Sequence, residues 1–307
     1  FARRILGNRP RRFPFRDEIR RERGRNVISE FPLFVFTTLA GLSAGAYVAS
    51  AAFPVGGREN AGVALAGKAG GLGGPDGVGA AGAVGADARG ARPWLFPLVC
   101  LALLGLGLVG CLGHLARPAL VLNALVNPQA GIAQEAYLSI AYGVLLLVEC
   151  IVVLRGKKSS RILSLACAVA AVGLTVVMGM AYLANLGTPA WVSWATVPLF
   201  VLGDALMGFA LYPLFSGWAY RKTAFFGIFM AIAVLFAVSL AFEANHFFDT
   251  HHSAIPFLVA IAIVAVAAAL ALATRRRGGK VMPVATFVCV FMGVCIARWA
   301  FYSASVV

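Results

Sequence analysis

Residues 94–113 read WLFPLVCLALLGLGLVGCLG, a stretch without one charged side chain, and His114, Arg117 and Pro118 follow it directly. An α-helix of about 20 apolar residues is long enough to cross the hydrocarbon layer of a bilayer. The stretch therefore predicts a transmembrane helix that ends with an imidazole and a guanidinium group at a membrane boundary. Such groups are costly there and usually functional, so the role of His114 is the first question that this sequence raises.

Apolar stretches of similar length recur along the 307-residue chain, which is 61% hydrophobic and only 12% charged. A soluble domain carries about twice that share of charged residues. The apolar stretches are continuous, whereas a transmembrane β-barrel requires alternating strands. We therefore expect an all-α integral membrane bundle of eight transmembrane helices, with both termini on one side. The expected spans are roughly 31–53, 94–113, 133–154, 162–184, 195–215, 223–243, 254–274 and 280–302.

Two segments outside these spans have unusual compositions. Residues 1–29 form a basic arm, in which residues 16–23 (RDEIRRER) predict a short charged helix. The arm fits binding to lipid headgroups and docking onto a partner subunit equally well. Residues 54–93 are rich in Gly and Ala and predict an extramembrane loop of low complexity within the anchor domain, residues 30–305. The net charge of +14 points to lipid or an acidic protein surface rather than to nucleic acid.

An even number of spans divides the loops between two ends of the bundle. We define face A as the end with the chain termini and the loops after the second, fourth and sixth spans, and face B as the other end. Face B holds the Gly-rich loop and three basic turns, at 155–161, 216–222 and 275–280. Titratable chemistry is expected at face A, which receives all four histidines and most acids near span ends: His114, His246, His251, His252, Glu30, Glu135, Glu243 and Asp249.

The membrane orientation follows less directly from the charges. Face B loops contain 14 Lys and Arg residues, and face A contains 12, of which ten lie in the basic arm. If the arm contacts a protein and is set aside, the positive-inside rule places face B in the cytoplasm. We therefore expect face A to be extracytoplasmic.

Histidine is the residue type best suited to exchange protons near neutral pH, and His114 is the histidine at the end of the second span. We expect His114 to accept a proton, whereas we expect Arg117 to contact a lipid phosphate or an acidic residue of a partner protein. Arg298 lies inside the last span, four residues before Tyr302, and requires a carboxylate or carbonyl partner there. The acids expected at face A are Glu30, Glu135 and Glu243, and both a structural ion pair and a ligand contact stay open for Arg298.

Two acids lie inside the expected spans. Asp204 is near the membrane midplane, and Glu149 is near face B, where Arg155, Lys157 and Lys158 are potential partners. A transporter would use such acids for proton relay or ion binding, and a structural protein would bury them in hydrogen bonds. An ion or small-molecule transporter is therefore one alternative function.

Metal and haem sites have little support in the sequence. His246, His251 and His252 are predicted to share a loop with Asp249, but their spacing matches no closed metal site and favours a contact to a partner. No histidine lies in the middle of a span, which excludes two stacked haems and leaves a b-haem subunit as a second alternative. The six cysteines form no Cys-x-x-Cys pair, which argues against an iron–sulfur cluster or zinc site.

Four short motifs occur in a characteristic order. They are Glu30-Phe-Pro-Leu-Phe-Val-Phe-Thr37, His114-Leu-Ala-Arg117-Pro118 followed by Asn123-Ala-Leu, Pro189-Ala-Trp191, and Arg298-Trp-Ala-Phe-Tyr302. With them the chain resembles, over about residues 28–305, the membrane-anchor subunit of dimethyl sulfoxide reductase, within the polysulfide-reductase-type quinone-linked anchors. The family commonly has Gly where Ala116 stands, and the basic arm and Gly-rich loop have no counterpart in it that we can interpret.

The resemblance implies a haem-free anchor, without an iron–sulfur cluster, in the inner membrane of a prokaryote. It implies oxidation of menaquinol and electron transfer to an iron–sulfur subunit that serves a molybdopterin catalytic subunit in anaerobic respiration. Both partners would dock on face A, and His114 matches the histidine of the quinol site. The candidate residues are His114, Glu135 and Glu30 for proton transfer, and His114, Arg117, Arg298 and Tyr302 for quinol binding.

Overall fold

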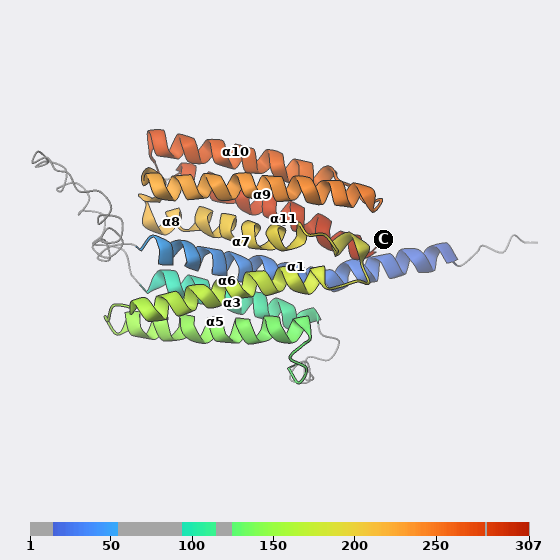
Figure 1. The fold of residues 1–307 in the computed structure, drawn as a ribbon, viewed down its shortest axis with the longest axis horizontal. Coiled ribbons are helices and arrows are strands. Elements are labelled where there is room, and N and C mark those ends of the chain that lie inside the picture. Colours follow the sequence, from blue (N-terminus) through green and yellow to red (C-terminus); the bar gives the residue numbers. More distant parts are fainter. Residues whose placement is uncertain (1–14, 55–93, 115–124, 280, 307) are drawn as a thin grey trace, which may run out of the picture.

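The structure is a computed structural model that describes the backbone of residues 15–54, 94–114, 125–279 and 281–306, and their side chains except for 15–30, 113, 114 and 306. Within these residues every regular element is a helix, and the long helices lie side by side (Figure 1). The long helices are α1 (Phe15–Ala52), α3 (Leu95–His114), α5 (Gly131–Leu154), α6 (Arg161–Leu183), α7 (Thr196–Leu211), α9 (Thr223–Asp249), α10 (Ile255–Arg277) and α11 (Val281–Ser303). The short helices are η3 (Pro189–Trp191), α8 (Pro213–Ser216), η4 (Ala219–Arg221) and η5 (Ala304–Val306).

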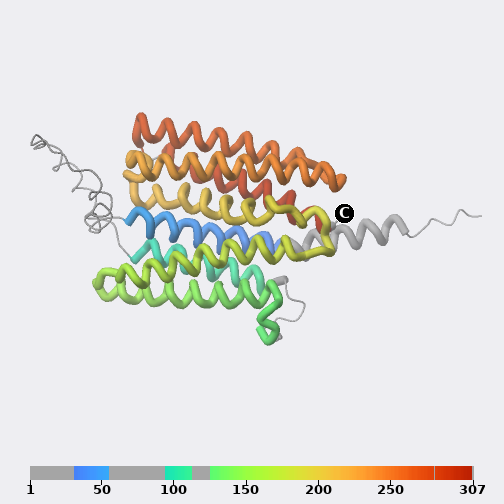
Figure 2. Tube along the Cα trace, in the orientation of Figure 1, coloured from blue at the N-terminus to red at the C-terminus, as the bar shows by residue number. Residues whose placement is uncertain are grey.

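Eight helices of the described chain are long and apolar enough to cross a membrane. They agree with the eight expected spans to within a few residues at most ends, and the predicted all-α membrane bundle is confirmed. Consecutive spans run in opposite directions along the bundle (Figure 2). Their outward side chains include Leu106, Val109, Ile162 and Leu165, each at least 60% exposed in the isolated chain. Hydrocarbon tails would cover such a surface at no cost, because lipid is as apolar as leucine.

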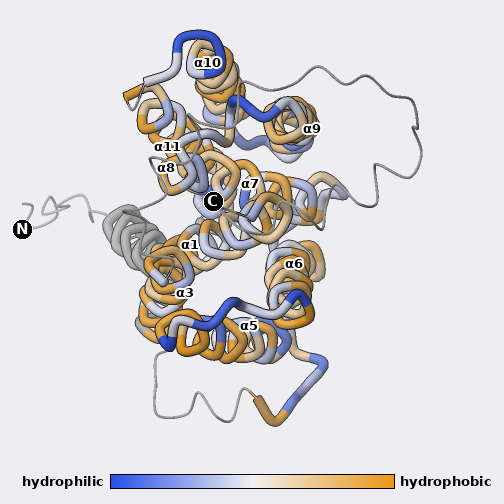
Figure 3. The backbone as a smooth tube through the Cα atoms, turned by 90° about the vertical axis from the view of Figure 1, so that its left-hand side faces the viewer, coloured by the Kyte–Doolittle hydropathy of each residue, from blue (hydrophilic) through white to orange (hydrophobic). Residues whose placement is uncertain are grey.

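The spans form two four-helix groups. In the N-terminal group α1, α3, α5 and α6 each pack against two others of the group, and in the C-terminal group α7, α9, α10 and α11 do the same. Figure 3, which looks along the helices, shows the two groups one above the other. Contacts of α1 with α7 and α11, and of α6 with α7, join the groups. Because they lie at this junction, α1 and α7 are the most buried spans.

Glycines allow α1 and α7 to approach closely at the junction. A Cβ atom on Gly208 would overlap the backbone of Gly45, and one on Gly45 would overlap the backbone of Asp204. Small residues are the usual means of close helix contact in membranes, where burying apolar side chains gives little driving force. The lack of a side chain at Gly45 and Gly208 therefore allows the two backbones to come into contact.

Two helix ends differ from the prediction. The expected sixth span ended at residue 243, but α9 continues to Asp249, so His246 and Asp249 lie in its last turns and not in a loop. The prediction was wrong because polar residues in the last turns of a long helix resemble a loop in composition. In addition, α1 begins at Phe15, so the charged helix expected within the basic arm is continuous with the first span, through Pro32.

Candidate functional site

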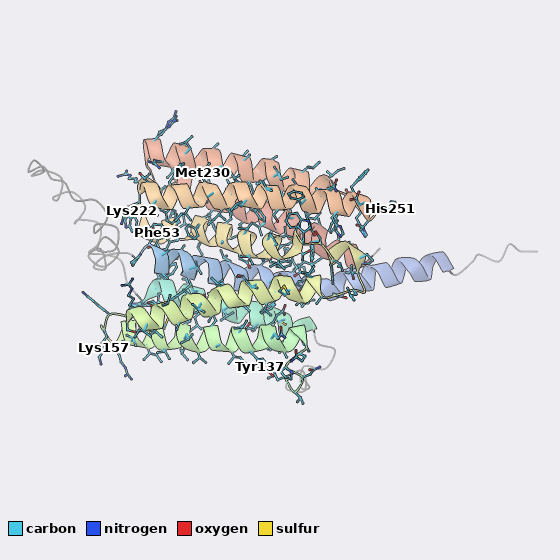
Figure 4. The ribbon with its side chains drawn as sticks, viewed as in Figure 1. Phe53, Tyr137, Lys157, Lys222, Met230 and His251 are labelled. Carbon is cyan, nitrogen blue, oxygen red and sulfur yellow. The ribbon has the colours of Figure 1, made fainter. Side chains whose placement is uncertain are left out.

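The segments that were predicted to share face A meet at one end of the bundle. Near the start of the first span, the hydroxyl of Thr37 lies 2.9 Å from that of Tyr302, near the end of α11. The indole nitrogen of Trp191, in the segment between α6 and α7, donates to the carbonyl oxygen of Phe301 at 2.7 Å. Figure 4 places His251 at one end of the bundle and Lys157 and Lys222 at the other, in agreement with faces A and B.

An aromatic cluster fills the junction of the two groups beneath face A. The ring of Tyr182 on α6 stacks on Phe200 of α7 with centroids 5.1 Å apart and an interplanar angle of 8°. The same ring meets Trp191, Phe301 and Tyr302 edge to face at 5.3, 5.7 and 5.3 Å. Such aromatic pairs stabilise a fold by more than the burial of their apolar area. The cluster is therefore an apolar contact surface that both groups of helices share.

Glu135 lies at the same end, on the buried face of α5. It lies near the start of α5, at the end of the bundle where α3 ends at His114 and α11 ends at Ser303. The structure therefore places Glu135, Tyr302 and the end of α3 at the same end of the bundle, on three different helices. The side chains of His114 and Glu30, and all of Arg117, lie outside the described residues.

Arg298 does not pair with any of the described acids expected for it. Its Nη2 atom lies 2.5 Å from Oδ1 of Asp204 on α7, and the two side chains are 1% and 0% exposed. Its Nη1 atom donates to the carbonyl oxygen of Thr37 at 2.7 Å, and its guanidinium carbon is 4.9 Å from the centre of the Phe200 ring. A Cβ atom on Gly41 would overlap the Asp204 carboxyl, so the absence of a side chain there makes room for the pair.

This ion pair therefore joins three helices, α1, α7 and α11, at the junction of the two groups. Its charges balance within the hydrocarbon layer, which is what a buried pair requires. The pairing was missed because the sequence shows which groups are buried but not which distant spans are neighbours. The signal was nevertheless present, since Asp204 and Arg298 are opposite charges deep within two spans.

Glu243 is a further buried acid near face A. It is 0% exposed, and its Oε1 atom accepts from the hydroxyl of Thr196 at 3.5 Å. Its Oε2 atom has no hydrogen-bond partner among the described residues. Thr196 begins α7, and the partial positive charge of a helix N-terminus favours a carboxylate at this position. One turn later, Nε2 of His246 lies 3.1 Å from the carbonyl oxygen of Pro189.

The two acids proposed for transport do not share a site. Asp204 belongs to the C-terminal group and is bound by Arg298. Glu149 belongs to the N-terminal group, where it accepts hydrogen bonds from Tyr47 and from Ser164, the latter at 3.4 Å. None of the basic residues that follow Glu149 forms an ion pair with it in the described structure.

Among the residues that the structure describes, no group of three or more His, Cys, Asp and Glu side chains is placed to hold a metal ion. His252 uses its Nδ1 atom in a 3.2 Å contact with the hydroxyl of Thr250. All six cysteines are free, and all lie buried or half-buried in spans. A scan of protein-family models finds none that matches the chain, and a search of curated proteins finds no match either.

Proposed function

We propose that the chain is the haem-free membrane anchor of an anaerobic respiratory molybdopterin reductase complex, where it binds and oxidises menaquinol and passes electrons to an iron–sulfur subunit. The supporting observation is that Glu135, Tyr302 and the end of α3 lie at the same end of the bundle as the aromatic cluster. These groups come from α3, α5 and α11, and the last residue of α3 is His114, for which the sequence predicts proton exchange.

Quinol oxidation makes three demands on such a site. It needs a surface for a flat apolar ring, hydrogen bonds to two hydroxyl groups, and a base that accepts protons as the electrons leave. The aromatic cluster would supply the apolar surface. His114 would accept the first proton, and Glu135 and Glu30 would pass protons to the water at face A. Tyr302 and Arg117 would hold the quinol oxygens.

Arg298 would act in this site through its neighbours. Both of its terminal nitrogens are engaged, one by Asp204 and one by Thr37. Thr37 in turn is hydrogen-bonded to Tyr302. We therefore assign Arg298 the role of a residue that positions Tyr302 for the quinol, and not that of a direct ligand.

The electrons need an acceptor outside this chain. Each quinol releases two electrons and two protons, and the cysteines here are separate free thiols. The proposal therefore includes an iron–sulfur subunit, with its molybdopterin partner, docked on face A. The chain is a multi-pass membrane protein, and we propose the inner membrane of a prokaryote with face A extracytoplasmic.

The test is His114→Ala in the membrane-bound complex, with His252→Ala as the control. His252 is also at the face A end, but it follows α9, and its ring lies beside Thr250 and Phe247. Electron paramagnetic resonance should show that menaquinol reduces the partner's clusters in the control and at least about 100-fold more slowly in His114→Ala, the effect of losing a positioned base. Normal reduction in His114→Ala would refute the proposal, and a haem band in the dithionite-reduced chain would favour a b-haem subunit.

A further inference from the structure

Helix α5 buries a line of polar side chains along one face. Glu135, Ser139, Tyr142 and Glu149 are all buried, with Leu146 as an apolar member between the last two. Their spacing of four, three and seven residues keeps them on a single side of the helix. The opposite side carries exposed aliphatic residues such as Ile140, Val144 and Leu147. We call the four polar residues, together with their α1 partners Ser43 and Tyr47, the α5 polar stripe.

The stripe has a carboxyl group near each end of the span. Glu135 lies four residues after the helix begins, and Glu149 lies five residues before it ends. A rise of 1.5 Å per residue separates the two positions by about 21 Å. Because the hydrocarbon layer is ~30 Å thick, the stripe covers most of it. Intramembrane acids arranged in this way are typical of proton relays.

Helix α1 contributes hydroxyl groups that bond to two of the α5 side chains. The hydroxyl of Tyr142 lies 3.0 Å from that of Ser43, which also donates to the carbonyl oxygen of Cys100 at 2.7 Å. Tyr47 donates to Glu149, and its ring lies 6.1 Å from that of Tyr142. Two hydroxyl groups of α1, on Ser43 and Tyr47, therefore lie on either side of the position at which Leu146 interrupts the stripe.

Ser139 occupies the interval between Tyr142 and Glu135. Its hydroxyl is buried and has no hydrogen-bond partner among the described residues. A serine inside a helix usually bonds to a backbone carbonyl of the preceding turn, as Thr175 and Thr286 do in this protein. A buried hydroxyl without a partner requires an explanation, and a role as a transient donor and acceptor supplies one.

The surroundings of the stripe leave its carboxyl groups free to exchange protons. The neighbouring helices contribute thiols, Cys100 and Cys111 of α3 and Cys167 of α6, and Cys150 follows Glu149 directly. In the described structure no Lys, Arg or His side chain forms an ion pair with Glu135 or Glu149. Asp204 differs in this respect, because Arg298 neutralises it permanently.

We propose that the α5 polar stripe is a proton path across the N-terminal group. A proton enters at Glu149 near face B, passes over the hydroxyls of Tyr47, Tyr142, Ser43 and Ser139, and leaves from Glu135 near face A, or moves in reverse. In each step one O–H bond breaks and another forms, so that no group changes its net charge after the proton has passed. The path goes beyond quinol oxidation, since it requires no redox reaction.

The experiment measures proton flux in liposomes that contain the full chain. Valinomycin and a potassium gradient set the membrane potential, and a pH-sensitive dye in the lumen reports the flux. Ser139→Ala is the sharpest variant, because it removes a hydroxyl that bonds to nothing in the described structure. Tyr142→Phe and Glu149→Gln interrupt the path at two further points while keeping the shape of each side chain.

Each of the three variants should lower the protein-dependent flux by about 100-fold, the lower range for loss of a positioned proton-transfer group. Tyr137→Phe, on the exposed side of α5, and Glu243→Gln, a buried acid of the C-terminal group, should retain the wild-type flux. Unchanged helical circular dichroism in Ser139→Ala separates a relay from a packing role. Wild-type flux no higher than that of empty liposomes, or full flux in Ser139→Ala, would overturn the proposal. Neither result bears on the His114 assay.

Discussion

The ion pair between Asp204 and Arg298 should be the strongest polar contribution to the stability of the bundle. Arg298 makes two short contacts, 2.5 Å to Asp204 and 2.7 Å to the carbonyl oxygen of Thr37. A hydrogen bond with a charged partner contributes about 1.5–3 kcal/mol. Asp204→Asn would leave a guanidinium that no proton transfer can neutralise, and breaking a buried pair in this way costs about 3–5 kcal/mol.

Arg298→Met should be less damaging. The carboxyl group that remains can take up a proton and become neutral, whereas the guanidinium left by Asp204→Asn cannot. The free energy of unfolding then falls only by the contribution of the lost hydrogen bonds, about 2–3 kcal/mol. The double variant carries neither charge, so it should lose less free energy of unfolding than the two single variants lose together. The difference, the coupling energy, should be about 2 kcal/mol, as expected for residues in contact.

The free energy of unfolding can be measured by titrating the purified chain in mixed micelles with sodium dodecyl sulfate and following its far-ultraviolet circular dichroism. The competing expectation is that hydrogen bonds between membrane helices contribute only ~0.6 kcal/mol on average. Single-variant costs no larger than that, or additive costs in the double variant, would refute the argument. The order also matters, because Arg298→Met costing more than Asp204→Asn would contradict the reasoning about neutralisation.

Two further substitutions test the packing near the pair. Gly41→Ala should destabilise the chain by about 1–3 kcal/mol through overpacking, because the added Cβ would overlap the Asp204 carboxyl. The control is Gly105→Ala, where nothing lies within 4 Å of the added Cβ. It should be neutral or stabilising in the same titration. Trp191→Phe should cost about 1–3 kcal/mol by leaving the Phe301 carbonyl without its indole donor; an unchanged unfolding midpoint would show that α11 needs no partner at this end.

The spans could be predicted from the sequence because each depends on local composition. Twenty apolar residues such as 94–113 require a transmembrane helix whatever surrounds them. Gly41 and Gly45, four residues apart, also indicate a close helix contact on one side of the first span, although they do not identify the partner helix. The sharing of face A by Trp191 and Tyr302 followed from counting spans, as an even number of crossings separates them.

The neighbours of each span could not be predicted in this way. Glu30, Glu135 and Glu243 were the acids nearest to Arg298 by predicted depth, but lateral position decides the partner, and the described structure pairs Arg298 with Asp204. The α5 polar stripe was missed for a related reason. Within an apolar span, Ser139 and Tyr142 are inconspicuous until the buried side of the helix is known.

Thr37 connects the ion pair to the candidate quinol site. Its carbonyl oxygen accepts from Arg298, and its hydroxyl bonds to Tyr302, one turn further along α11. Two residues of α11 therefore hold one residue of α1, and α11 cannot slide along α1 without breaking both bonds. Since Tyr302 also lies against Tyr182 of α6, the same contact fixes the N-terminal group relative to the C-terminal group at face A. A charge at Asp204 is thus explained by the need to hold Arg298, and transport is not required to account for an acid at this depth.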